Sequence, residues 1–260
     1  MVKKGYDIQN TKQKSSSFKN TDYKKSDIDD KSDIGDNSNE GDNSESLLDQ
    51  RFYDVSEVYP QLNDIYLNLP EIKLEISKIV SEDNVELWND WPEKDIYATN
   101  REWKIIPFKA FDVIVNDNCK RFPHLWRFIS NIPNIRVAII SKLGPGMKLK
   151  PHRGWGSHSN HVLRCHFGLN VPKENACFIS VADKFDQENN IPIDEEIRYH
   201  SQDKWLVFDD SKHHYAENPT DADRIVLILD IDRPPKVKAG TSDEKDTKEL
   251  LEIINSFKNK

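Results

Sequence analysis

Apolar and β-branched residues are concentrated in short runs in the second half of the chain. Turn-forming sequences separate these runs, at Gly144-Pro145-Gly146, at Pro172, at 183–190 and at Asn218-Pro219. We expect five strands, at residues 136–143, 162–171, 176–181, 204–208 and 224–231. Because no helical pattern alternates with them, these strands predict an antiparallel barrel or sandwich.

Helical periodicity is found on both sides of this strand-rich part. Residues 72, 76, 79 and 80 are apolar and follow Leu69-Pro70, which predicts a helix that packs on the core. Residues 119–130 form a second predicted helix. A last helix carries an apolar stripe at Leu250, Ile253, Ile254 and Phe257 and is expected to pack back on the domain. Thr241 and Glu244 have the spacing of a capping box for it.

The first 46 residues differ in composition from the rest. They are rich in Lys, Ser, Asp and Asn and end in DDKSDIGDNSNEGDNSES, with few large apolar side chains. Such a segment cannot bury enough surface to offset its chain entropy, so residues 1–46 are predicted to be a disordered polar tail. From residue 47 large apolar side chains arrive together, and we expect one folded domain at 47–260.

Strand alternation makes the polar residues of two strands informative. In VLRCHFGLNV, Arg164, His166, Gly168 and Asn170 share one face, which lines either a pocket or solvent. In RIVLILDI both faces are mostly apolar, so Arg224 should point at a bound anion or pair with an internal aspartate. In RVAIIS, Ser141 places a hydroxyl at the end of an apolar row.

Two loops carry histidines where a metal could bind. His152 follows a turn in KPHRG, and His214 follows a strand in DDSKHH. Two neutral imidazoles at the same end of a barrel would suit a divalent transition metal, although two histidines alone do not establish a site. His213 competes with His214 for this role, and His158 and His161 are expected to face solvent in a polar loop.

The chain resembles the aspartyl/asparaginyl beta-hydroxylase family of iron- and 2-oxoglutarate-dependent oxygenases over residues 132–235. The motifs that carry the resemblance are SKLGPGMKLKPHRG, LRCHFGLNVP with KENACFISVAD, and WLVFDDSKHHYAENPTDADRIVLILDI. The resemblance implies a mainly β fold with flanking helices, built on a double-stranded β-helix (jelly-roll or cupin-like) core. It also favours His214 over His213, through the ten-residue step to Arg224.

The resemblance also implies roles for individual residues. His152 and His214 correspond to the iron ligands, and Gly154 stands where the wider superfamily has a carboxylate, a departure typical of this family, in which water takes that position. Ser141, His166 and Arg224 correspond to contacts with 2-oxoglutarate, and Arg164 to a substrate-binding arginine. A second substrate arginine is replaced by Val162. Asp209 and Asp210 are expected to orient the loop or a ligand imidazole.

The resemblance implies an Fe(II)- and 2-oxoglutarate-dependent dioxygenase that uses O2 to hydroxylate an aspartyl or asparaginyl β-carbon in a protein or peptide. The alternatives are a lipid acyl-chain hydroxylase of the same family, a non-catalytic cupin-like binding module, and a structural zinc domain, which would need four protein ligands.

Charge, hydropathy and cysteine content restrict the setting. A net charge of −8 does not favour nucleic acid as a partner. No apolar run reaches the roughly 20 residues of a membrane helix, and the N-terminus lacks the apolar core of a signal peptide. Three cysteines outside CxxC spacing indicate neither a disulfide framework nor a thiolate zinc site. We therefore expect a cytoplasmic protein.

Overall fold

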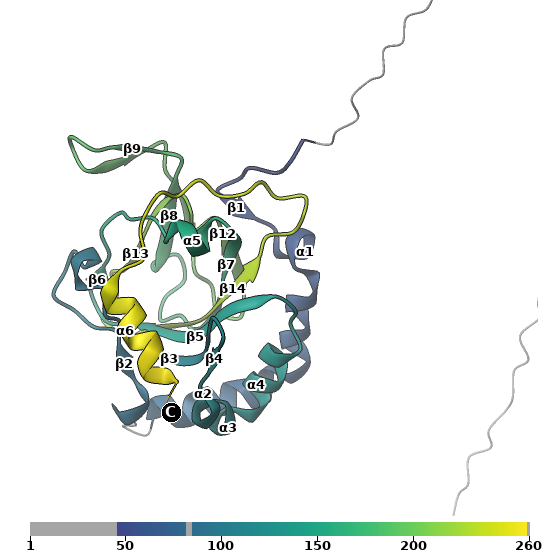
Figure 1. Cartoon of the computed structure of the whole chain (residues 1–260). Coiled ribbons are helices and arrows are strands. Elements are labelled where there is room, and N and C mark those ends of the chain that lie inside the picture. Colours follow the sequence, from purple (N-terminus) through teal and green to yellow (C-terminus); the bar gives the residue numbers. More distant parts are fainter. Residues whose placement is uncertain (1–45, 82–84, 259–260) are drawn as a thin grey trace, which may run out of the picture. The chain divides into compact units, whose positions relative to one another are not determined.

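The structure is a computed structural model that describes residues 46–81 and 85–258 (Figure 1). Residues 45–260 form one unit by their contacts. The predicted tail lies, up to residue 45, outside the described residues. From residue 47 onwards the expected core residues Phe52, Tyr53 and Tyr59 are buried, whereas Leu47 is exposed.

A large antiparallel sheet forms the centre of this unit. Its strand order is β1-β12-β7-β14-β5-β3-β2, and β4 pairs with β3 at one end. The strands are β1 (Phe52–Tyr53), β2 (Asn89–Asp90), β3 (Trp103–Ala110), β4 (Val113–Ile114), β5 (Ile135–Leu143), β7 (Val162–Asn170), β12 (Trp205–Phe208) and β14 (Arg224–Asp232). The central strand β14 pairs with β5 on one side and with β7 on the other.

A smaller antiparallel sheet has the order β11-β8-β13-β6. Its strands are β6 (Met147–Lys148), β8 (Phe178–Ala182), β11 (Glu196–Tyr199) and β13 (His213–Asn218), and a separate hairpin joins β9 (Lys184–Asp186) to β10 (Ile191–Ile193). From β5 to β8 and again from β11 to β14 the chain alternates between the two sheets. This winding is the double-stranded β-helix, and the predicted fold class is confirmed.

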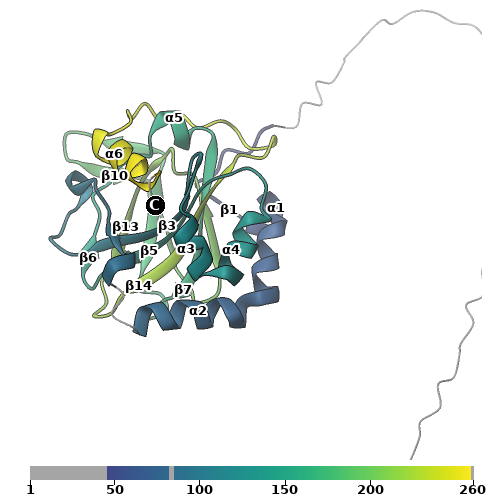
Figure 2. The same cartoon turned by 60° about the horizontal axis from the view of Figure 1, so that its bottom comes forward.

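Helices cover the outer face of the large sheet (Figure 2). They are α1 (Val55–Val58), the 3-10 helix η1 (Pro60–Asn68), α2 (Leu69–Ser81), α3 (Asn116–Arg121) and α4 (Pro123–Ser130). Ile72 and Ile76 of α2 are buried against this face together with Cys165 and Phe167 of β7. Since Cys165 and Phe167 point outward to the helices, their polar neighbours on β7 point to the other face, between the sheets.

The inner face of the large sheet packs against two elements. Next to the small sheet, Trp103, Leu143 and Phe208 of this face form a cluster with apolar residues of the small sheet. Further along, Ile105, Ile139 and Ile228 pack against α6 (Lys248–Phe257). The predicted docking of the last helix on the domain is therefore confirmed, and Figure 1 shows α6 lying close to β3.

The structure corrects three expectations about elements. The helix expected at 119–130 is two helices, because Pro123 lacks an N–H and displaces Phe122 from helical geometry. The capping box at Thr241 and Glu244 is wrong, because α6 begins at Lys248 after Thr247. Strand β3 (Trp103–Ala110) precedes the five expected strands and was not among them. The remaining short elements are the 3-10 helices η2 (Val85–Leu87) and η3 (Lys94–Ile96), and α5 (Gly156–Ser159).

Candidate functional site

His152 and His214 lie directly opposite each other at one end of the small sheet. After β6 the chain continues alongside β13, where the backbone N–H of Leu149 donates to Ala216. His152 and His214 then form an isolated antiparallel bridge, in which each backbone N–H donates to the other residue's carbonyl at 2.9 and 2.8 Å. Two segments far apart in sequence thus carry their imidazoles side by side, with ring centroids 4.4 Å apart. We call these two residues the histidine pair.

Backbone carbonyls fix the orientation of both rings. The Nδ1 atom of His152 is 2.8 Å from the carbonyl of Lys150, and the Nδ1 atom of His214 is 2.9 Å from the carbonyl of Lys212. Because a carbonyl can only accept, each Nδ1 carries the proton and each Nε2 keeps its lone pair. Burial and the neighbouring His214 lower the pKa of His152 to about 3, and burial lowers the pKa of His214 to about 4. The histidine pair is therefore neutral at pH 7, as metal ligation requires.

The space beside Gly154 is occupied by the side chain of Asp210. A Cβ atom at position 154 would overlap Asp210 Oδ2 and would lie 2.8 Å from the Cβ of Ser159. The other carboxylate oxygen of Asp210 is 3.3 Å from His214 Nε2. The carboxylate of Asp210 thus occupies the space that a side chain at position 154 would take. Within residues 46–81 and 85–258, however, no group of three histidine, cysteine or acidic side chains has the arrangement of a complete metal site.

Arg164 lies next to Asp210 but is already paired with two carboxylates. It donates to both oxygens of Asp230 at 2.8 Å each, and its Nη1 is 2.6 Å from Asp210. His158 adds a contact of 2.8 Å to Asp230 and is buried, contrary to the expectation that it faces solvent. Burial raises the pKa of Asp230, but Arg164 and His158 more than offset this, so that its pKa lies below the ordinary value. Arg164 is therefore neutralised within the protein and offers no unpaired positive charge to a substrate anion.

Arg224 lies at the start of β14 and is 3% exposed. The buried amide of Asn218 positions it by donating to the carbonyls of Leu143, Gly144 and Ala222, which holds the turn before β14. Arg224 Nε and Nη1 are buried and have no hydrogen-bond partner. Burial lowers the pKa of Arg224 to about 10, so the guanidinium is still charged at pH 7. An unpaired buried cation is costly, and this one therefore indicates an anion site.

Ser141 and His166 flank β14 on the same inner face. Ser141 lies opposite Val226, and His166 lies opposite Ile228. The Ser141 hydroxyl accepts a hydrogen bond of 3.0 Å from Trp103 and can still donate its own proton, while His166 Nε2 is buried without a partner. We call Arg224, Ser141 and His166 the anion pocket.

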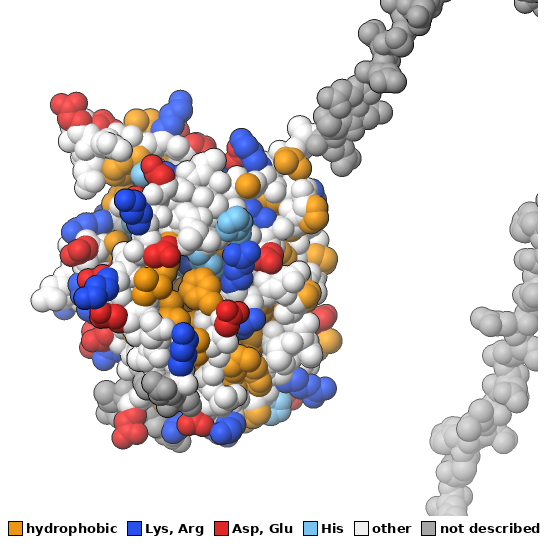
Figure 3. Space-filling model, in the orientation of Figure 1, with side chains coloured by type: hydrophobic (Ala, Val, Ile, Leu, Met, Phe, Trp, Pro, Cys, Tyr) orange, Lys and Arg blue, Asp and Glu red, His pale blue; other side chains and the backbone are white. Residues whose placement is uncertain are grey.

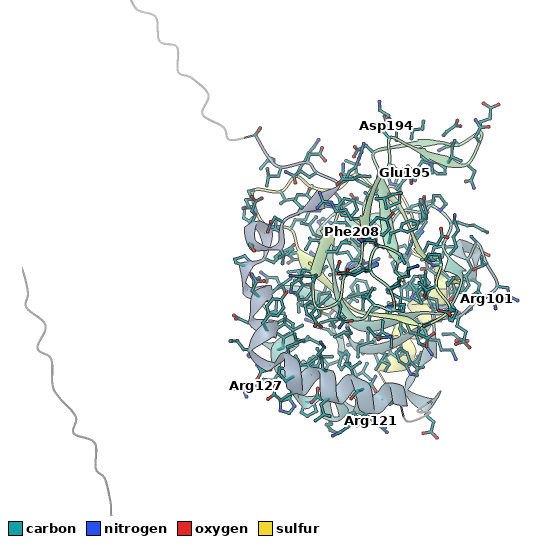
Figure 4. All side chains as sticks on the ribbon, turned by 180° about the vertical axis from the view of Figure 1, so that it is seen from behind. Arg101, Arg121, Arg127, Asp194, Glu195 and Phe208 are labelled. Carbon is teal, nitrogen blue, oxygen red and sulfur yellow. The ribbon has the colours of Figure 1, made fainter. Side chains whose placement is uncertain are left out.

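Phe208 lies between the histidine pair and the anion pocket. Its ring centroid is 5.2 Å from that of His166 and 5.5 Å from that of His214. Figure 4 shows Phe208 in the interior of the folded unit, whereas Arg121 and Arg127 lie at its margin near the helices. Phe208 thus connects His214 of the histidine pair with His166 of the anion pocket.

Sequence reasoning missed the role of His200, which is 2% exposed and comes directly after β11. Its Nε2 atom is 3.0 Å from His166 Nδ1, and its Nδ1 atom has no hydrogen-bond partner. Only the fold brings His200 to β7, since β11 is an edge strand of the small sheet. His213, the competitor of His214, instead stacks on Phe185 with ring centroids 4.5 Å apart.

A cavity of about 290 Å³ lies beside these residues. Its lining includes His152, Arg164 and Asp210, together with Leu250, Ile253 and Ile254 of α6. The other charged residues that line it are Glu93, Arg153, Asp230, Glu244 and Lys245. Figure 3 shows apolar side chains gathered over the region of α6, with acidic and basic side chains around them. The cavity is therefore an apolar space that reaches the histidine pair.

Cys119, Cys165 and Cys177 are buried and free. Among the helices of the described residues, none is long and apolar enough to cross a membrane.

Asp209 holds the loop that precedes His214. Its two oxygens accept from Arg233 at 2.5 and 2.9 Å, and one of them also accepts from the backbone N–H of Ser211. Asp209 thus orients the loop, whereas Asp210 faces the histidine pair.

Comparison with known proteins agrees with this geometry. The aspartyl/asparaginyl beta-hydroxylase family matches residues 67–234. The chain is 31% identical over 189 residues to an ornithine lipid ester-linked acyl 2-hydroxylase of Rhizobium tropici, and the match covers 72% of this chain and 62% of that protein. The chain therefore spans less than two thirds of the length of this relative.

Solved structures give more distant likenesses. A 2OG-Fe(II) oxygenase family oxidoreductase from Burkholderia pseudomallei has a TM-score of 0.43 and 12% identity, covering 70% of this chain and 94% of that one. A prolyl-4-hydroxylase from Pseudomonas putida has a TM-score of 0.43 and 11% identity, covering 67% and 98%. On the match of its own sequence to the family, the chain belongs to the aspartyl/asparaginyl beta-hydroxylase family.

Proposed function

We propose that this chain is an Fe(II)- and 2-oxoglutarate-dependent dioxygenase. Membership of a hydroxylase family supports an enzyme with oxidoreductase-type activity. The observation that carries the proposal is that the same domain contains two fixed, neutral imidazoles and a buried arginine, Arg224, whose Nε and Nη1 have no hydrogen-bond partner. The imidazoles suit a transition metal, and Arg224 suits a dicarboxylate that also reaches the metal.

Two groups of residues would bind the metal and the co-substrate. His152 and His214 would hold iron through Nε2, and Asp210 presents a carboxylate beside them. Arg224 would pair with the distal carboxylate of 2-oxoglutarate, and Ser141 would donate its hydroxyl proton. Bound iron and 2-oxoglutarate would supply the oxidising chemistry that replaces hydrogen by hydroxyl on an unactivated carbon. The apolar side chains around Phe208 exclude water from this region.

The geometry supports an acyl chain as the substrate better than an aspartyl side chain. The cavity beside His152 is lined mainly by apolar side chains of α6 and the large sheet. The two arginines that line the cavity cannot serve a substrate carboxylate, because Arg164 is paired with Asp210 and Asp230, and Arg153 with Asp243. The remaining cation of the lining, Lys245, is exposed to solvent. The relative from Rhizobium tropici acts on an ester-linked acyl chain, which supports the same choice. The family name alone favours the peptide β-carbon.

Succinate formation from 2-oxoglutarate tests the activity. We expect His152→Ala and His214→Ala to reduce turnover with Fe(II) at least 100-fold, since each removes half of the protein ligands. His213→Ala is the matched control, because His213 stacks on Phe185 outside the pair, and it should retain turnover. Equal turnover in all three variants would remove the metal assignment.

Product analysis with two substrate classes tests the choice of substrate. An ester-linked acyl lipid and an Asp- and Asn-containing peptide are incubated separately with the enzyme, Fe(II), O2 and 2-oxoglutarate. We expect one added oxygen atom on the acyl chain by mass spectrometry. Hydroxylation of the peptide alone would instead restore the aspartyl/asparaginyl β-carbon as the target.

A further inference from the structure

Unpartnered polar nitrogens of three buried side chains lie around the anion pocket. They are Nε and Nη1 of Arg224, Nε2 of His166 and Nδ1 of His200. All three residues are less than 5% exposed. Buried polar atoms in folded proteins nearly always have partners, so a convergence of orphans indicates that a ligand completes the site. His200 is the one member of this group to which the family resemblance gives no role.

The contact between the two imidazoles restricts their protonation. His166 Nδ1 and His200 Nε2 are 3.0 Å apart, and one of these two atoms must carry the shared proton. If His166 donates, its Nε2 is a bare lone pair and repels a carboxylate. If His200 donates, His166 Nε2 carries a proton and can donate it to a carboxylate. Burial and Arg224 lower the pKa of His200 well below its ordinary range, so a neutral ring must make this choice.

The backbone fixes His200 in position for this donation. Its N–H donates to the carbonyl of Cys177 at 2.8 Å, which ties it to the segment before β8. His166 is held in β7 between β12 and β14. The two rings are nearly parallel, with an interplanar angle of 12°. If His166 and His200 served packing alone, His166 Nε2 and His200 Nδ1 would have hydrogen-bond partners, or apolar side chains would stand in place of the histidines. Neither is the case here.

We propose that His200 is a positioning residue for 2-oxoglutarate: it donates its Nε2 proton to His166 and thereby fixes the His166 tautomer that donates from Nε2 to a co-substrate carboxylate. This inference rests on the proposed function. Without the His200 donor, His166 can place its proton on Nδ1 and present a lone pair to the anion. The loss should appear in 2-oxoglutarate binding, because His200 does not contact the histidine pair.

Binding of 2-oxoglutarate to the zinc-loaded chain tests the proposal without turnover. Zn(II) suits imidazole ligands and has no redox chemistry, so calorimetry can measure binding in equilibrium. His200→Phe keeps a ring but removes the donor, and we expect roughly tenfold weaker binding. His200→Gln retains an amide donor and should recover most of the affinity. His161→Phe, at an exposed histidine, is the matched control and should bind as wild type does.

Nitrogen NMR of the histidine rings reports the tautomer of His166. This tautomer would not change if His200 had only a structural role. In the wild type, addition of 2-oxoglutarate should fix His166 with a protonated Nε2 and a bare Nδ1. In His200→Phe, the His166 signals should shift toward a protonated Nδ1, even in a sample whose thermal unfolding matches that of the wild type. If His200→Phe is less stable than the wild type, the spectra of both proteins are recorded at a lower temperature at which the variant is folded.

The outcomes separate the two proposals. If the wild type binds 2-oxoglutarate and His200→Phe binds it equally well with the same His166 tautomer, the role of His200 is wrong while the proposed function stands. If the wild type does not bind 2-oxoglutarate at all, the proposed function fails and this inference fails with it. Weaker binding in His200→Phe, with recovery in His200→Gln and a changed tautomer, supports the proposal.

Discussion

Asp210 takes the space that a side chain at position 154 would need. The overlap of a Cβ atom at residue 154 with Asp210 Oδ2 means that the two positions cannot both carry side chains in this arrangement. Glycine at 154 is therefore explained by tertiary packing as well as by membership of the family. The sequence alone could show that a carboxylate was missing at 154, but not that Asp210 fills its place, because the contact joins two distant loops.

The double substitution of Gly154 and Asp210 tests this relation. Gly154→Ala should lower the free energy of unfolding by about 1–3 kcal/mol, since the added methyl group forces Asp210 and Ser159 to shift. In an Asp210→Ala background the same change should cost less, because the main overlap is gone. Urea unfolding of the four proteins measures the coupling. Additive effects would show that Asp210 does not restrict position 154.

Arg164 provides a second test at the residue scale. Arg164→Met leaves Asp230 as a buried charge without its main partner, and we expect a loss of about 3–5 kcal/mol in the free energy of unfolding. Arg164→Lys keeps the charge but loses the two-pronged contact, so it should recover only part of the loss. Arg198→Met breaks an exposed pair with Glu196 and should change stability by less than about 1 kcal/mol.

Urea unfolding at pH 7 measures all three substitutions of arginine. An Arg164→Met protein as stable as Arg198→Met would contradict a structural role for the buried pair. Arg164 would then be free to bind a substrate anion, as the family resemblance implies.

At the scale of elements, periodicity predicted the strands with long apolar runs and missed the polar strand β13 and the proline-containing strand β3. The five expected strands correspond to β5, β7, β8, β12 and β14, whose apolar runs are long or strictly alternating. Strand β13 was not predicted, because HHYAEN is polar and its pairing with β8 comes from tertiary structure. Pro107 interrupts β3 in sequence, although β3 pairs with β5 on either side of it.

The candidate site divides in a similar way. Strand parity grouped Arg164 with His166 on one face and set Ser141 at the end of an apolar row, since period-two alternation is a local property. It left open whether the face of Arg164 and His166 lines a pocket or solvent. The sequence could not show that Arg164 is saturated by two aspartates or that His200 meets His166. Both facts depend on contacts between segments that are far apart in the sequence, for which a single sequence carries no local signal.

Helix α6 forms one wall of the apolar cavity, which gives a prediction about substrate length. Ile254→Trp should fill part of the 290 Å³ space and shift turnover toward shorter acyl chains, while the affinity for 2-oxoglutarate stays unchanged. Leu251→Trp is the matched control, because Leu251 is 43% exposed and does not line the cavity. Activity profiles over a series of acyl chains measure the effect. Identical profiles for both variants would place the acyl chain elsewhere.

At the scale of the whole molecule, the space between the two sheets contains an unusual number of neutral imidazoles. His166, His200 and His214 are each 5% exposed or less. Burial lowers the pKa of each of them, to about 4 for His214 and well below the ordinary range for the other two. The fold therefore accommodates these rings only in their uncharged form, which links its stability to pH.

This linkage predicts that the protein without added metal loses stability as the pH falls from about 6.5 toward 4. In that window the unfolded chain takes up protons on these histidines while the native state does not, so each contributes a slope of about 1.4 kcal/mol per pH unit. Burial raises the pKa of Asp210, which opposes the trend for one group. The Asp230 carboxyl, with its lowered pKa, adds its loss only below its ordinary pKa of 3.8.

Urea unfolding between pH 4.5 and 7.5 checks the prediction, and His200→Gln shows its origin. Glutamine does not titrate, so this variant should lose about 1.4 kcal/mol per pH unit from the slope of stability against pH. His161→Gln removes an exposed imidazole and should leave the slope unchanged. If His200→Gln has the same slope as the wild type, His200 takes up its proton at the same pH in the native state as in the unfolded chain, and the lowered pKa of this ring is contradicted. A charged His200 would still donate from Nε2 to His166, so the argument from two neutral rings would then apply only above the pH at which His200 is protonated.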